Sequence, residues 1–186
     1  FAVFANGGYL KEPYYIDKII DSNDSKIGLK SSITNLDTPR IIDPRNAFVM
    51  DSMLKDVIKV GTARRANSLK RTDIAGKTGT TNDLIDAWFV GYNPEVITLT
   101  WFGYDVPKSL GENETGSRAA LPIWIDYMRG ALDGIPEKIY EEPDGIIPHK
   151  INLKDGTLVD NESESGVYEY FFEEYLPHDN AFFMIN

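Results

Sequence analysis

Apolar residues recur at helical spacing in two segments of the chain. The first follows Asp43-Pro44, a good helix start because aspartate accepts the N-cap hydrogen bond and proline tolerates the first helical position. It ends before Gly61, and its apolar face consists of Ala47, Met50, Leu54, Val57 and Ile58. The second ends before Gly134 and Pro136, and its apolar face consists of Leu121, Ile123, Trp124, Tyr127, Met128, Ala131 and Leu132. We predict two amphipathic helices.

Between these helices the pattern is that of a sheet. Residues 73–81 predict a strand with a glycine-rich centre, and residues 86–92 predict an aromatic strand. After a turn at Asn93-Pro94, residues 96–104 predict a third strand. Consecutive strands joined by short turns pair antiparallel, so the fold class is α+β, with an antiparallel sheet flanked by helices.

The two ends of the chain have a different character. FAVFANGGYL resembles the end of a helix stopped by Gly7-Gly8, and we expect the chain to be part of something longer. A short strand signal follows at residues 14–20. From about residue 137 onward the chain is rich in proline, acidic and turn residues, with one aromatic cluster at 168–176.

Composition narrows the classes of function. The 186 residues carry a formal net charge of -10, and such an acidic surface repels phosphate backbones, so we expect no nucleic-acid partner. There is no cysteine, which excludes thiol catalysis. His149 and His178 are isolated, so we expect no metal site. Local cations precede residue 78 and are expected to form a solvated face: Arg64, Arg65, Lys70, Arg71 and Lys77.

The sequence KTGTTN at residues 77–82 is the clearest candidate for chemistry. It is not a phosphate loop, because Arg71 occupies the position where that motif needs a glycine. In a strand, Thr78 and Thr80 share one face, and Gly79 lets a ligand approach the backbone. Two hydroxyls with the Lys77 ammonium nearby would suit a carboxylate, and a backbone N–H at such an edge could stabilise an oxyanion. Spacing alone equally fits an inert, solvated strand rich in threonine.

The wider sequence context favours the first interpretation. IAGKTGTTND, followed by DAWFVGYNP, preceded by GTARRA (61–66) and followed by ALPIWIDYM (120–128), resembles the C-terminal half of the penicillin-binding transpeptidase domain. It is most similar to the bifunctional, class A penicillin-binding proteins of the 1A type. The resemblance extends to the chain's ending, in INLKDGTLVD and EYFFEEYLP. It implies a domain over residues 1–136 and a C-terminal extension over 137–186.

The resemblance also implies roles for individual residues. Lys77 and Thr80 would be catalytic, Lys77 through positive charge and proton relay, and the Thr80 N–H through an oxyanion hole. The residues that bind substrate would be Thr78, Gly79, Thr80, Thr81 and Asn82. The ligands would be β-lactams and peptidoglycan stem peptides ending in D-Ala-D-Ala, and the resemblance implies no metal or other cofactor.

The nucleophile that this chemistry needs is not convincingly present. Families of this kind use Ser-x-x-Lys and Ser-x-Asn motifs with Lys-Thr-Gly. Ser52 and Lys55 fit the first, but Ser52 lies only 25 positions before Lys77, and the sequence contains no Ser-x-Asn. We expect Ser52 to be a helix-surface serine and the nucleophile to lie in the N-terminal part of the same protein, so that this chain alone is inactive.

Two alternatives remain open at this stage. A serine β-lactamase or β-lactam sensor would share the Lys-Thr-Gly strand, and a non-catalytic cell-wall-binding module could retain it. The 1A-type resemblance implies the periplasmic face of a bacterial inner membrane, with a glycosyltransferase domain and the membrane anchor outside this chain. No apolar stretch here is long enough to cross a bilayer.

Overall fold

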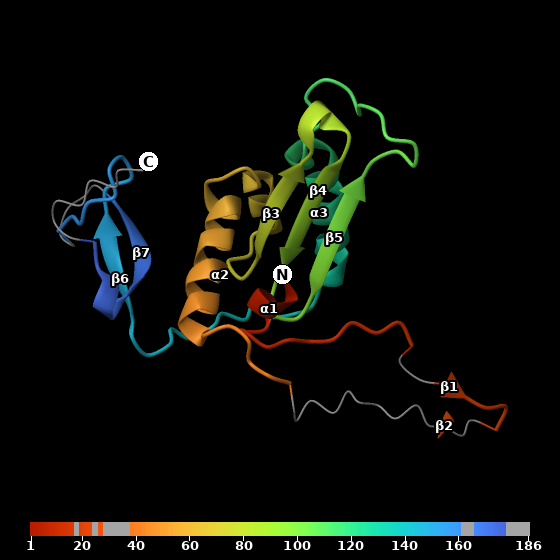
Figure 1. Ribbon diagram of the computed structural model, residues 1–186, viewed down its shortest axis with the longest axis horizontal. Helices are drawn as coiled ribbons and strands as arrows, with labels where there is room; N and C mark the ends of the chain where they lie inside the picture. The colour runs from red at the N-terminus through yellow and green to blue at the C-terminus, as the bar shows by residue number, and fades with distance from the viewer. Residues whose placement is uncertain (17–18, 24–25, 28–37, 161–165, 178–186) are drawn as a thin grey trace.

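The computed structural model describes residues 1–16, 19–23, 26–27, 38–160 and 166–177. His178 lies outside these residues, as does part of the strand signal at 14–20. Figure 1 shows a central sheet with helices packed against it, a small hairpin at the C-terminal end and a long excursion near the N-terminus. The α+β class with an antiparallel sheet is confirmed.

The central sheet has three strands, β3 (Ala75–Thr80), β4 (Ala87–Tyr92) and β5 (Ile97–Phe102), in sequence order and antiparallel. All three match the strands predicted from the sequence. The register pairs Thr78 with Phe89 and Gly79 with Trp88. Paired residues share a face, so Thr78 and Phe89 lie on one side of the sheet and Gly79 and Trp88 on the other.

The first predicted helix is α2 (Pro44–Lys59), whose N-cap residue Asp43 accepts a hydrogen bond from the Arg45 N–H at 2.9 Å. Its buried positions include Leu54 and Ile58, but Met50 is 37% exposed, so that part of the predicted face is wrong. Asp51 is buried in its place. The short 3₁₀ helix η1 (Arg64–Leu69) follows α2 directly.

The second predicted helix is α3 (Leu121–Ala131), preceded by one π-helical turn, η3 (Gly116–Ala120). Trp124 and Met128 are fully buried, whereas Ile123 and Tyr127, predicted for the same face, are about half exposed. Ile125 is buried instead. The helix therefore presents a face turned slightly from the predicted one.

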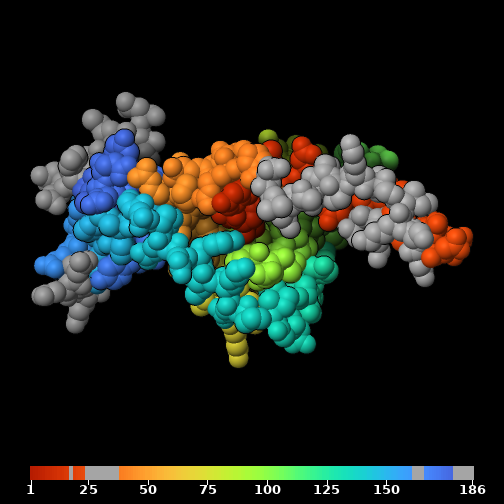
Figure 2. Space-filling view, turned by 90° about the horizontal axis from the view of Figure 1, so that it is seen from below, coloured from red at the N-terminus to blue at the C-terminus, as the bar shows by residue number. Residues whose placement is uncertain are grey.

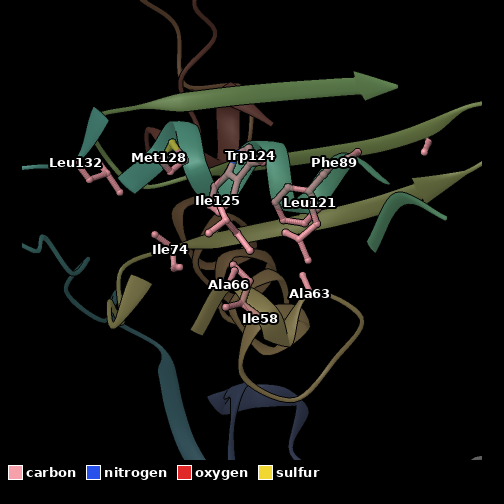
Figure 3. Close-up of a cluster of buried hydrophobic side chains, with 12 residues drawn as sticks. Ile58, Ala63, Ala66, Ile74, Phe89, Leu121, Trp124, Ile125, Met128 and Leu132 are labelled. Carbon is pink, nitrogen blue, oxygen red and sulfur yellow. The ribbon is translucent and has the colours of Figure 1, made fainter. Parts of the chain in front are cut away.

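The main core lies between α3, η1 and one face of the sheet (Figure 3). Trp124 of α3 packs edge-on against Phe89 of β4, with ring centroids 4.9 Å apart. Ile58 from the end of α2 and Ala63 and Ala66 close the cluster from the other side. A second cluster joins Ala5 of α1 (Ala2–Ala5) with Leu54, Ala75 and Tyr92, so α2 contributes to both.

The remaining elements are small. A two-stranded ribbon, β1 (Ile19–Ile20) with β2 (Lys26–Ile27), lies in the N-terminal excursion. Near the C-terminus, β6 (Ile146–Ile151) pairs antiparallel with β7 (Val167–Phe172), which is followed by the 3₁₀ turn η4 (Glu173–Tyr175). The space-filling view shows this hairpin, in blue, beside the orange α2 (Figure 2), where Tyr170 packs edge-on against Phe48.

Segment 137–140 is bonded to the body of the molecule. The Glu137 carboxylate accepts hydrogen bonds from the N–H and hydroxyl of Thr72, and the Lys138 N–H donates to Asp73 at 3.2 Å. The Tyr140 hydroxyl donates to the Ala5 carbonyl oxygen. Within the described residues, no helix combines the length and the apolar character needed to cross a membrane.

Candidate active site

Among the described residues, β3 is one of the two edge strands of the central sheet, and its outer edge, which pairs with no described strand, carries backbone groups of Thr78 and Thr80. The Thr81 N–H donates to the Asp86 carbonyl at 3.1 Å, which makes Thr81 and Asp86 a hydrogen-bonded pair of the ladder. In an antiparallel ladder such pairs alternate with non-bonded ones. Gly79 therefore bonds toward β4, while the N–H and C=O groups of Thr78 and Thr80 point away from it.

The two threonine side chains are held from the same face by groups of other elements. Thr80 Oγ1 accepts the Gly116 N–H at 3.0 Å, at the start of η3. Thr78 Oγ1 lies 2.8 Å from Thr62 Oγ1, which belongs to the loop after α2. Because the Gly116 N–H can only donate, the Thr80 hydroxyl keeps its own proton for another acceptor. A carboxylate is such an acceptor.

Gly116 packs directly on the strand pair. A Cβ atom on Gly116 would lie 2.4 Å from the carbonyl oxygens of both Gly79 and Trp88. Gly79 is less constrained, since its added Cβ would meet the Trp88 Cβ at 3.2 Å. The prediction that Gly79 lets a ligand approach the backbone stays a prediction, and the structure adds Gly116 as a position where the strand pair leaves no room for a side chain.

Lys77 lies on the opposite face from the two threonines and is exposed. Its ammonium bends to the free edge and donates to the Thr78 carbonyl oxygen at 2.8 Å. The Lys77 ammonium therefore lies at the strand edge beside Thr78, although its side chain leaves the strand on the other face. Lys77, Thr78, Gly79 and Thr80 thus form one continuous edge.

Thr81 and Asn82 lie beyond the strand, in the turn that leads to β4. The Thr81 hydroxyl accepts the Asp86 N–H at 2.8 Å, so it already serves the turn. Asn82 is exposed and begins the 3₁₀ turn η2 (Asn82–Leu84). Both residues lie at the end of the candidate site rather than along its edge.

One member of the basic cluster is not solvated. Arg71 forms a bidentate pair with the Asp73 carboxylate, at 2.8 and 2.7 Å, and its side chain is only 12% exposed. Burial alone would raise the pKa of Asp73, but hydrogen bonds from Arg71, Asn93 and the Lys138 N–H outweigh it and lower that pKa. Arg71 is therefore a structural residue, while Arg64, Arg65 and Lys70 are exposed as predicted.

The Ser52-x-x-Lys55 pattern does not form a catalytic pair. The Lys55 ammonium lies 2.7 Å from the carboxylate of Asp51, which is 3% exposed and also accepts the Tyr92 hydroxyl at 2.9 Å. Ser52 lines an apolar groove between α2 and the β6–β7 hairpin, beside Met53 and Tyr170. The lysine is thus committed to an ion pair and is not available to activate Ser52.

Sequence reasoning missed several residues that contact the candidate site. The GTARRA segment was recognised, but nothing local indicates that Thr62 reaches Thr78, which is 16 residues away. Trp88 and Trp101 are large apolar residues on predicted strands, which favours a place in the core. They are 36% and 42% exposed on the Lys77 face of the sheet, with ring centroids 6.0 Å apart.

Comparison with known proteins places the chain in a family. The profile of the penicillin binding protein transpeptidase domain matches residues 1–124, two thirds of the chain. The chain therefore belongs to the family of penicillin-binding protein transpeptidase domains.

Particular relatives are penicillin-binding proteins 1A. The chain is 43% identical to that of Neisseria lactamica over 187 residues, covering 100% of this chain and 21% of the relative. For Neisseria gonorrhoeae the identity is 49% over 148 residues, covering 79% and 18%. The crystal structure of penicillin-binding protein 1A from Haemophilus influenzae superposes with a TM-score of 0.83 at 32% identity, covering 95% of this chain and 31% of that chain. The chain thus spans about a fifth of the length of its Neisseria relatives.

Proposed function

We propose that the chain supplies one wall of a serine D,D-transpeptidase site that cross-links peptidoglycan stem peptides and is acylated by β-lactams. The observation that carries this proposal is the β3 edge, where two hydroxyls, an ammonium and outward-pointing backbone N–H groups lie side by side. Such groups suit an acyl donor that ends in a carboxylate. Family membership and the 1A-type relatives support the same reaction.

In this mechanism Thr78 and Thr80 hold the carboxylate of the donor by hydroxyl donation, and Lys77 adds positive charge. A serine from the N-terminal part of the same protein attacks the donor carbonyl. The new C–O bond forms, the C–N bond breaks, and the serine proton passes to the leaving amine. The Thr80 N–H, at the free edge, donates to the carbonyl oxygen while it carries negative charge. The amine of a second stem peptide then attacks the acyl carbonyl. The new C–N bond forms, the C–O bond to the serine breaks, and a proton from the amine returns to the serine oxygen.

The same framework extends to the rest of the protein. We infer that residues 137–186 form an extension that packs on the domain of residues 1–136, since Lys138 bonds to Asp73 and Arg45 pairs with Glu174 at 2.7 Å. The site would face the periplasm, held at the inner membrane by an anchor outside this chain. The 1A-type relatives support this placement.

The alternatives differ in what happens after acylation. A serine β-lactamase would release hydrolysed penicillin rapidly, whereas a transpeptidase keeps the acyl-enzyme. A non-catalytic module would not become acylated. The match of the chain to penicillin-binding proteins 1A through both the sheet and the C-terminal hairpin favours the transpeptidase.

The test uses the complete polypeptide and a fluorescent penicillin. Changing Thr78→Val and Thr80→Val together keeps the side-chain shape and removes both hydroxyls. A hydrogen bond to a charged group is worth about 1.5–3 kcal/mol, so each loss should slow acylation roughly 10- to 100-fold. Thr100→Val, on β5 of the same sheet, is the matched control and should acylate normally. Undiminished acylation of the double variant would refute the proposal.

Peptide mapping of the labelled protein locates the nucleophile. Label on a serine upstream of Phe1 supports the proposed arrangement of the site. Label on Ser52 would contradict it, because Lys55 would then have to leave its ion pair with Asp51.

A further inference from the structure

The turn that follows Thr80 has an unfavourable backbone conformation. Asp83 and Leu84 have φ values of 61° and 54°, in the left-handed region that non-glycine residues seldom adopt. Each such residue costs of the order of 1–3 kcal/mol, and the conformation persists only where the surroundings hold it. The turn therefore needs external restraint to keep one conformation.

Asp86 provides that restraint from both its backbone and its side chain. Its N–H donates to Thr81 Oγ1 at 2.8 Å and its carbonyl accepts the Thr81 N–H at 3.1 Å, closing the turn. Its carboxylate accepts the indole N–H of Trp101, on β5, at 2.8 Å. The turn between β3 and β4 is thus fastened to the third strand of the sheet.

The indole of Trp101 is itself guided to this position. A Cβ atom on Gly103 would lie 2.4–2.8 Å from the six-membered ring and the indole nitrogen, so the ring rests directly on the backbone of Gly103. The Trp101 ring also lies beside the Trp88 ring, and the planes of the two rings are tilted by 43°. Because Trp101 is 42% exposed, its position depends on the contact with Gly103 and the bond to Asp86 rather than on burial.

The same region is held from a third direction. The Leu110 N–H donates to the Leu84 carbonyl at 2.8 Å, and the Gly116 N–H donates to Thr80 Oγ1 at 3.0 Å. The Thr81–Asp86 pair is the last rung of the β3–β4 ladder, and Thr80 is the residue directly before it. A displacement of that rung would move both the N–H and the hydroxyl of Thr80.

We propose that Asp86 and Trp101 form a positioning pair that fixes the Thr80 N–H and hydroxyl for acyl transfer. This inference rests on the proposed function of the β3 edge. Neither side chain needs to touch the substrate. Their bond holds a strained turn in place, and the turn holds Thr80.

The test compares variants of the complete polypeptide by two constants, the affinity of initial penicillin binding and the rate of acylation. Asp86→Ala and Trp101→Phe each remove the bond, and we expect each to slow acylation about tenfold with a smaller change in initial affinity. The double variant should be no slower than either single one, because both changes remove the same bond. Asp86→Asn keeps an acceptor oxygen for the indole N–H and should stay within twofold of the parent.

Trp88→Phe is the matched control. It makes the same chemical change on the same face of the sheet, and in the part of the chain that the structure describes the Trp88 indole N–H donates no hydrogen bond. It should acylate at the parent rate. Thermal unfolding of each variant establishes that it is folded at the assay temperature.

Three outcomes would overturn the inference. Acylation of Asp86→Ala and Trp101→Phe within twofold of the parent would show that the bond does not position the site. Equal losses for Asp86→Asn and Asp86→Ala would assign the effect to charge, and equal losses for Trp88→Phe and Trp101→Phe would assign it to ring size. A Lys77→Ala variant separates the two proposals, since normal acylation of that variant would refute the proposed function itself.

Discussion

Gly116→Ala is expected to separate η3 from the strands that carry the candidate site. The added Cβ would lie 2.4 Å from the carbonyl oxygens of Gly79 and Trp88, whereas ordinary contacts begin at 3.4 Å. The difference means that the segment must move by about 1 Å. Both obstacles are backbone atoms within a paired ladder, so no side-chain rotation can relieve them. The same movement stretches the 3.0 Å bond from Gly116 to Thr80 beyond hydrogen-bonding range.

The expected cost follows from these contacts. Overpacking typically costs about 1–3 kcal/mol and a lost hydrogen bond about 1 kcal/mol. Replacing glycine restricts the unfolded chain and returns about 0.4–1 kcal/mol. The net loss of unfolding free energy is about 2 kcal/mol, which corresponds to roughly 4–8 °C in the unfolding midpoint of a domain of this size.

The assay measures the thermal unfolding midpoint and the penicillin acylation rate of the complete polypeptide. Both should fall for Gly116→Ala. Gly130→Ala in α3 is the matched control, because its added Cβ meets nothing within 4 Å and alanine favours helix. If the Gly116 variant equals the Gly130 variant in both measurements, the close contact between η3 and the β3–β4 pair does not exist in solution.

Three further predictions concern other parts of the chain. Ser52→Ala should leave penicillin acylation of the complete polypeptide unchanged, and a loss above twofold would make Ser52 part of the site. Residues 1–186 produced alone should not be labelled by fluorescent penicillin, since the proposed nucleophile lies upstream; covalent labelling of this piece would refute that arrangement. Because the folded pKa of Asp73 is lowered, its stabilising contribution is complete above its unfolded pKa of about 3.9 and is lost as the pH falls through the folded value. Unfolding midpoints between pH 5 and pH 2 should therefore fall more steeply for the parent than for Asp73→Asn, and parallel curves would contradict the assignment.

The elements predicted from the sequence are those with local signals. Asp43-Pro44 begins α2 because the Asp43 side chain accepts a hydrogen bond from the N–H of Arg45, only two residues further on. The Asn93-Pro94 turn joins β4 to β5 because the conformation of a turn depends on adjacent residues. The spacing of Thr78 and Thr80 correctly placed them on one face. Each of these conclusions depends on a few consecutive positions.

The errors arise where distant elements decide the outcome. Met50 and Ile123 fit an apolar helical face, yet they are exposed. The elements that pack on α2 and α3 contact another side of each helix, and the spacing of apolar residues alone does not fix that side. Trp88 and Trp101 are large and apolar like core residues, but their side chains are 36% and 42% exposed. The contact of Thr62 with Thr78 and that of Gly116 with Thr80 join residues 16 and 36 positions apart. No periodicity encodes such pairs.

The open side of β3 has a consequence for the behaviour of this chain in solution. In the part of the chain that the structure describes, no strand pairs with this side of β3. An edge without a strand partner is a template on which another extended polypeptide can add, including a second copy of the same chain. Lysine on an exposed strand is a common deterrent to such self-association, because like charges would be brought together at the seam. Lys77, whatever its part in chemistry, is thus also expected to keep molecules of this chain from assembling edge to edge.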